Sequence, residues 1–191
     1  MKIDKAMIPN CITSLRIIGS ALLLLAKPFS PYFFIVYTVC GVSDVLDGFL
    51  ARALNAESET GSILDSISDI MFYSAMLFHI VPYLIPILPL PIWYAVTVIL
   101  AVRLCAYLIA GIKYRRFASI HTYANKITGG ALFCVPYLIH IFDPIAVCSA
   151  VCIIGGYASM EEILIHVFSN KYSPNVKSIF LIGKFKNSDQ Q

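Results

Sequence analysis

Charge is scarce in this chain of 191 residues. Only 13% of the residues are charged, whereas 59% are hydrophobic. A soluble globular domain carries about a quarter of its residues as Asp, Glu, Lys or Arg. The mean hydropathy is accordingly high, at +0.79. This shortage of charge excludes an ordinary soluble domain and predicts an all-α integral membrane protein, for which we expect no nucleic-acid partner.

Several sequence patterns are also missing. The six cysteines include no CxxC pair, and most of them lie in apolar runs. Cys148 and Cys152 are one helical turn apart, but small buried apolar residues are a better interpretation of this pair than a metal or redox site. No internal repeat or low-complexity run is present. No small-residue cleavage pattern follows the first apolar run, so we expect no cleavable signal peptide.

The apolar runs predict six membrane-spanning helices in a single domain that covers residues 1–191. Residues 1–9 would form a short interfacial lead, residues 10–168 the six-helix core, and residues 169–191 a polar, basic tail. The tail would either rest on anionic membrane lipid or stay solvated. The expected spans are 10–27, 31–54, 61–80, 92–114, 122–142 and 145–168.

Basic residues indicate the orientation of these spans. The outer connections hold only Lys27, and the connection 81–91 has no charge and four prolines, whereas Arg52 and the cluster Lys113, Arg115, Arg116 and Lys126 lie at the opposite ends of the spans. The positive-inside rule therefore places both termini and the connections 52–60 and 113–126 in the cytoplasm. The prolines predict a stiff, non-helical outer connection.

Four carboxylates lie inside apolar segments, where charge is costly and usually functional. They are Asp44, Asp47, Asp65 and Asp69. Spacings of three and four residues place each pair on one helical face. A hairpin of the second and third spans would bring the two faces together. Such a set of hard oxygen ligands suits one or two Mg²⁺ or Mn²⁺ ions, whose coordination shells phosphate oxygens would complete.

Small and basic residues accompany the acids. Gly48, Ala51 and Gly61 leave room for a ligand or for close helix packing, and Arg52 adds a cation suited to phosphate. Arg16 shares a face of the first span with Asn10 and Thr13. It would either extend to the membrane interface or bind an anionic group near the acids, and its polar neighbours favour the second interpretation.

The pattern Asp44-x-x-Asp47-Gly48-x-x-Ala51-Arg52, followed after eight residues by Gly61-x-x-x-Asp65-x-x-x-Asp69, resembles the signature of the CDP-alcohol phosphotransferases at every fixed position. The resemblance implies a membrane enzyme in which an alcohol oxygen attacks the β-phosphorus of a CDP-linked donor and CMP leaves. Homodimers are common in that family.

The resemblance also implies a role for each site residue. Asp44, Asp47 and Asp65 would be metal ligands. Asp69 would be the catalytic base, and it would also lie near a second metal ion. The residues expected to bind the CDP-linked donor are Asn10, Thr13, Gly48, Ala51, Arg52 and Gly61.

The length resembles that of small bacterial members, which act in the cytoplasmic membrane and transfer a phosphatidyl group from CDP-diacylglycerol. A CDP-amino-alcohol is the alternative donor. For the acceptor we expect glycerol 3-phosphate, as in phosphatidylglycerophosphate synthases, with a phosphate site drawn from basic residues of the fourth and fifth spans. The candidates are Arg103, Arg115, Arg116 and Lys126.

Other interpretations remain at this point. The positive-inside rule explains Arg115 and Arg116 equally well, and Glu161 or Glu162 would pair structurally with Arg103 or Lys126. The acceptor would alternatively be that of a phosphatidylserine or phosphatidylinositol-phosphate synthase. Intramembrane acids also mark ion and proton transporters, but no inverted repeat supports that class.

Overall fold

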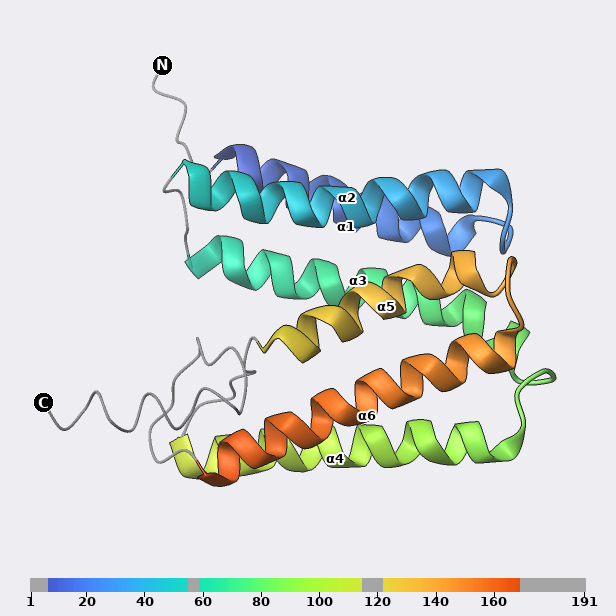
Figure 1. The fold of residues 1–191 in the computed structure, drawn as a ribbon. Helices are drawn as coiled ribbons and strands as arrows, with labels where there is room; N and C mark the ends of the chain where they lie inside the picture. Colours follow the sequence, from blue (N-terminus) through green and yellow to red (C-terminus); the bar gives the residue numbers. More distant parts are fainter. Residues whose placement is uncertain (1–6, 55–58, 115–121, 169–191) are drawn as a thin grey trace, which may run out of the picture. The chain divides into compact units, whose positions relative to one another are not determined.

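The computed structural model describes residues 7–54, 59–114 and 122–168, and the regular secondary structure within them is entirely helical (Figure 1). The predicted all-α class is therefore confirmed for the described residues. The helices are α1 (Met7–Leu25), α2 (Pro31–Ala53), α3 (Glu59–Leu84), α4 (Leu90–Tyr114), α5 (Tyr123–Leu138) and α6 (Pro144–Phe168).

Four of these helices have segments long and apolar enough to cross a membrane. They are Pro31–Ala53, Ile63–Leu84, Leu90–Lys113 and Pro144–Val167. Cys11–Leu25 is a shorter apolar stretch. Large apolar side chains such as Leu100, Leu104 and Leu108 on α4 are more than half exposed, as a lipid-facing surface requires. The chain is thus a membrane protein, while the count of six spans stays a prediction.

Local sequence sets the helix ends. Pro31 is the first residue of α2, and the Ser30 side chain accepts a hydrogen bond from the Phe33 amide. Thr122 caps α5 in the same way by accepting from the Asn125 amide. Proline suits the first turn because its missing N–H would have no intrahelical acceptor there.

Several predicted bounds were wrong. The first helix begins at Met7, inside the expected lead of residues 1–9, and ends at Leu25. The fifth helix ends at Leu138, short of the expected residue 142. The outer connection is shorter than predicted, because Pro82 lies within α3 and Pro91 within the first turn of α4. Proline is tolerated in the first turn, as at Pro91, whereas at Pro82 the lost hydrogen bond and the ring's clash with the i−4 carbonyl affect only the end of α3.

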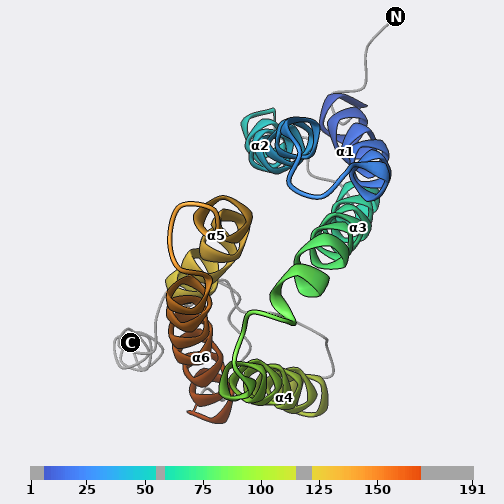
Figure 2. The same ribbon diagram turned by 90° about the vertical axis from the view of Figure 1, so that its right-hand side faces the viewer.

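The chain forms two compact units, residues 1–86 and 87–191. In the first unit α1 lies against both α2 and α3 (Figure 2). The core of this unit is aromatic: Tyr37 stacks on Phe33 and on Phe72, with ring centroids 5.7 and 5.0 Å apart. His79 Nε2 lies 2.8 Å from the carbonyl oxygen of Leu23, which ties α3 to the end of α1.

In the second unit α6 lies against α4 and α5. Gly155 of α6 lies at the contact with α5, where a Cβ would be 3.6 Å from Cγ2 of Thr128, an ordinary van der Waals distance. Gly129 and Gly130 of α5 have more room: among the described residues, no neighbouring atom lies within 4 Å of a Cβ placed at either glycine.

Candidate metal and donor site

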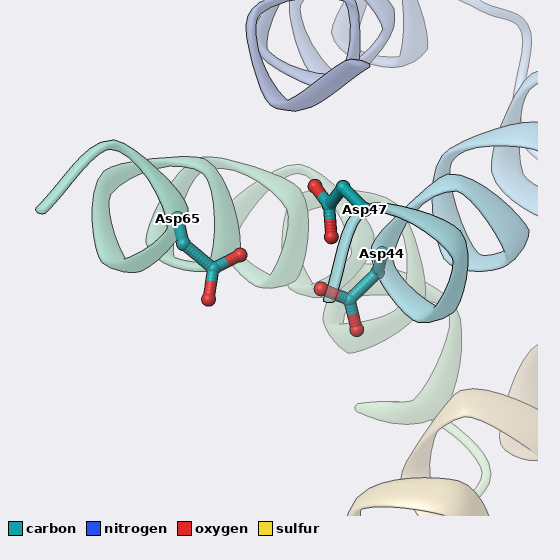
Figure 3. A group of neighbouring side chains, drawn as sticks. All are labelled: Asp44, Asp47 and Asp65. Carbon is teal, nitrogen blue, oxygen red and sulfur yellow. The ribbon is translucent and has the colours of Figure 1, made fainter. Parts of the chain in front are cut away.

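Three of the four predicted acids form a compact group. Asp44 and Asp47 project from α2 and Asp65 from α3, toward one another (Figure 3). One carboxylate oxygen from each lies within 4.8 Å of the other two. Asp47 is only 4% exposed, whereas the side chains of Asp44 and Asp65 are 48% and 49% exposed. The group is therefore buried at Asp47, and its open side, at Asp44 and Asp65, is accessible to solvent.

The helix α1 holds this arrangement together. α2 and α3 pack directly, as the expected hairpin requires: Tyr37 of α2 stacks on Phe72 of α3, and its hydroxyl donates to Met76 Sδ at 3.2 Å. Both helices also lie against α1. The acids meet because α1 presents a polar face to both neighbours. Arg16 and Thr13, one turn apart on α1, provide that face.

Arg16 contacts all four aspartates. Its Nη1 donates to Asp44 Oδ1 and, at 3.2 Å, to Asp69 Oδ1. Its Nη2 donates to Asp47 Oδ2 at 3.1 Å and to Asp65 Oδ1 at 2.6 Å. The sequence placed Arg16 near the acids as the binder of an anion, but not among the site residues. Its spacing from Thr13 was the available signal, and the carboxylates themselves are the anions it binds.

Asp69 lies beside the three-oxygen group. Its side chain is 44% exposed and one turn beyond Asp65 on α3, and Arg16 links it to the other acids. The exposed carboxylate is thus accessible to a substrate from the open side. Asp44, Asp47 and Asp65 are the three residues whose oxygens converge.

The converging oxygens fit a divalent cation. Oxygens that share one Mg²⁺ at about 2.1 Å lie no more than about 4.2 Å apart. A group already within 4.8 Å needs only small side-chain adjustments to reach that spacing. Carboxylate oxygens are also the ligands that Mg²⁺ and Mn²⁺ prefer. Asp44, Asp47 and Asp65 are the residues that would hold the ion.

The predicted donor-binding residues lie around these acids. Thr13 is 4% exposed, and its hydroxyl donates to Asp47 Oδ2 at 2.7 Å. The guanidinium of Arg52 lies over Gly48, because a Cβ there would lie 3.6 Å from Arg52 Nη1. Among the described residues no carboxylate forms an ion pair with Arg52, which is exposed.

The remaining donor candidates are small or only partly described. Ala51 is half-buried on the last turn of α2, and Gly61 is in the first turn of α3. Asn10 is helical and lies one turn before Thr13 on α1. Only its backbone belongs to the described part of the chain.

The acceptor candidates belong to the second unit. Arg103 Nη2 donates to Asn125 Oδ1 at 2.6 Å and lies 4.0 Å from Glu162 Oε2. The Asn125 amide donates to the same Glu162 oxygen at 3.2 Å. Glu162 is fully buried, so the predicted structural pair with Arg103 is confirmed. Lys126 is exposed on α5. Arg115 and Arg116 lie outside the described residues.

A protein-family match covers the residues of this site. The family model described as CDP-alcohol phosphatidyltransferase matches residues 6–157, which include all four aspartates and Arg16. No curated protein and no solved structure shows a significant match. Members of this family are membrane transferases of phospholipid synthesis that use divalent metal ions. The chain therefore belongs to the CDP-alcohol phosphatidyltransferase family and is an enzyme that transfers a substituted phosphate group.

Proposed function

We propose that this enzyme transfers the phosphatidyl group of CDP-diacylglycerol to glycerol 3-phosphate and releases CMP, as a phosphatidylglycerophosphate synthase does. The observation that carries the proposal is the convergence of Asp44, Asp47 and Asp65 beside an exposed Asp69. Membership of the family supports phosphatidyl transfer from a CDP-alcohol. The choice of acceptor rests on the basic residues Arg103, Arg115, Arg116 and Lys126.

In this proposal Asp44, Asp47 and Asp65 hold one Mg²⁺ or Mn²⁺ ion, with Asp69 beside a second. A divalent cation bound there would neutralise charge on the pyrophosphate and on the leaving CMP. The ligand set suits both metals equally. Either ion is therefore tried in the assay below.

The protein's own residues position and deprotonate the substrates. Asp69 takes the proton of the acceptor hydroxyl. The hydroxyl oxygen forms a bond to the β-phosphorus, and the bond from that phosphorus to the CMP oxygen breaks. Arg52 has an exposed guanidinium, whose planar fork matches two pyrophosphate oxygens. Gly48 has no side chain, so the Arg52 guanidinium lies close to the backbone of α2 at that point. Catalysis of this kind is mainly positioning and charge stabilisation.

One observation favours a second acceptor. Arg103 is engaged with Asn125 and the buried Glu162, so its charge is already balanced within the protein. An acceptor phosphate would have to compete with that pair. L-serine carries no phosphate, and a phosphatidylserine synthase is therefore the alternative function. Inositol phosphate, which has the same phosphate chemistry as glycerol 3-phosphate, belongs in the same panel.

We place the enzyme in the bacterial cytoplasmic membrane as a homodimer. The proposed topology has six spans, both termini in the cytoplasm and the four acids on the cytoplasmic side, within one domain over residues 1–191. The distribution of Lys and Arg supports this orientation. The helix α5 has 16 residues, about 24 Å, and is the shortest of the proposed spans.

The test of the function is an assay of CMP release. Purified enzyme receives CDP-diacylglycerol, Mg²⁺ or Mn²⁺, and glycerol 3-phosphate, L-serine or inositol phosphate in turn. We expect CMP release when glycerol 3-phosphate is the acceptor and not when either other acceptor is present. Release with L-serine and with neither other acceptor establishes the alternative. No release with any acceptor, or full activity in Asp69→Asn, contradicts the proposed reaction.

A further inference from the structure

Arg16 is the residue that the reaction scheme leaves without a role. Its side chain lies in the middle of α1 and is only 2% exposed, yet both terminal nitrogens face carboxylates. Its Nε is buried and has no hydrogen-bond partner among the described residues. The guanidinium is therefore directed entirely at the acids. A charge at this depth in an apolar helix is costly unless it is paired.

The charges in the cluster are unequal. Four carboxylates, those of Asp44, Asp47, Asp65 and Asp69, surround one guanidinium. Arg16 offsets only part of their mutual repulsion, and a divalent cation would offset more. Three of the four acids are also the ones whose oxygens converge for a metal ion. Arg16 and the ion must therefore share the same carboxylates.

We propose that Arg16 is the resident counter-cation of the aspartate cluster, which a divalent cation partly replaces. The guanidinium holds the carboxylates of α2 and α3 together and yields some of their oxygens when the ion binds. This inference rests on the metal site of the proposed function, but not on the reaction. Arg16 acts through the aspartates, so it is a positioning residue.

The proposal fixes the direction of one effect. Two cations that share three carboxylates repel each other, and this repulsion weakens metal binding in the native protein. Loss of Arg16 also leaves the aspartates more mobile, which opposes binding through side-chain entropy. The repulsion is the larger effect, because both cations would contact the same carboxylates, those of Asp44, Asp47 and Asp65. Removing the charge at position 16 should therefore tighten metal binding.

The experiment measures Mn²⁺ binding to the full-length protein in detergent after removal of metal with a chelator. The electron paramagnetic resonance signal of free Mn²⁺ reports the bound fraction directly. Arg16→Gln keeps a hydrogen-bonding side chain but has no charge. We expect its Kd for Mn²⁺ to fall roughly tenfold, about 1.4 kcal/mol. An unchanged or higher Kd would overturn the proposal.

Two further variants separate charge from packing. Arg16→Lys keeps the charge, so its Kd should stay closer to the native value than that of Arg16→Gln. A purely structural role would instead weaken binding in both variants. Lys113→Gln removes another cation, whose Nζ donates to the carbonyl oxygen of His166 in the second unit, and should leave the Kd for Mn²⁺ unchanged. An equal gain in affinity in this control would count against a local effect.

Folding of the neutral variant gives a second measurement. Without metal, Arg16→Gln should melt at a lower temperature than the native protein, and saturating Mn²⁺ should raise its melting temperature more. If the variant folds only with Mn²⁺, the ion has replaced the guanidinium as proposed. If it stays unfolded even with saturating Mn²⁺, the ion cannot replace Arg16, and the proposal is wrong.

The proposed reaction can fail separately. If Arg16→Gln binds Mn²⁺ more tightly than the native protein, but the native protein releases no CMP from CDP-diacylglycerol, the counter-cation proposal holds and the proposed reaction is wrong. If the native protein releases CMP and Arg16→Gln binds Mn²⁺ no more tightly, the proposed reaction holds and the counter-cation proposal is wrong.

Discussion

The hydrogen bond from Thr13 to Asp47 gives the sharpest test of how α1 supports the site. Thr13→Val replaces the hydroxyl by a methyl group of similar size and leaves Asp47, 4% exposed, without this donor. Hydrogen bonds between helices in membranes average about 0.6 kcal/mol, whereas bonds to charged groups contribute about 1.5–3 kcal/mol. The acceptor oxygen also bonds to Arg16, so the lower end applies. We expect a loss of about 1.5 kcal/mol.

Thr97→Val is the matched control. The Thr97 hydroxyl is exposed and donates to the carbonyl oxygen of Trp93 within the same helix, at 2.9 Å. Both substitutions put valine in a helix, so differences in helix propensity cancel. The measurement is the free energy of unfolding in mixed detergent micelles. Losses that agree within about 0.5 kcal/mol for Thr13→Val and Thr97→Val would refute the reasoning.

Three further predictions concern the base, the helix crossing and the buried pair. Asp69→Asn should lower the rate of CMP release by about 10²-fold or more while Mn²⁺ still binds, because the proton acceptor is lost but the three converging oxygens remain. Gly19→Ala should destabilise the protein by about 1–3 kcal/mol, since its Cβ would lie 2.5 Å from Cys40 Sγ. Glu162→Ala should cost about 1–3 kcal/mol in thermal unfolding, because Arg103 loses its buried counter-charge.

Each of these has its own control. Loss of Mn²⁺ binding in Asp69→Asn would show that Asp69 is a metal ligand and not only the base. Gly130→Ala, where no described atom lies within 4 Å, should be neutral or stabilising, and an equal loss there would contradict the close crossing at Gly19. Cys40→Ala should restore part of the stability of Gly19→Ala. A native free energy of unfolding in Glu162→Ala would show that the pair with Arg103 does not stabilise the protein.

The acids could be predicted from the sequence because helical periodicity is local. Spacings of three and four residues place Asp44 with Asp47, and Asp65 with Asp69, on single faces wherever the helices lie. The close approach of α2 and α3 was also expected, but the part played by α1 was not. α1 lies against both helices and brings Arg16 to the acids, and a sequence pattern within one helix does not reveal which third helix lies against it.

Arg103 shows the other limit. Its position within an apolar span predicts that it has a partner, since an unpaired cation is unfavourable there. Both a substrate phosphate and a protein carboxylate satisfy that need equally well. The choice of Glu162 depends on the packing of α4 against α6, a contact between residues far apart in the sequence. The structure shows the pair with Glu162, while the phosphate role of Arg103 stays a prediction.

The central claim is metal-dependent phosphatidyl transfer at the aspartates of α2 and α3. Its most direct test is CMP release from CDP-diacylglycerol by purified native protein and by Asp47→Asn, each with Mn²⁺ and with chelator. Asp47 is the buried member of the converging group. The account predicts release only by the native protein, only with the metal and only with an acceptor. Equal release by Asp47→Asn, or release that the chelator does not stop, would contradict it.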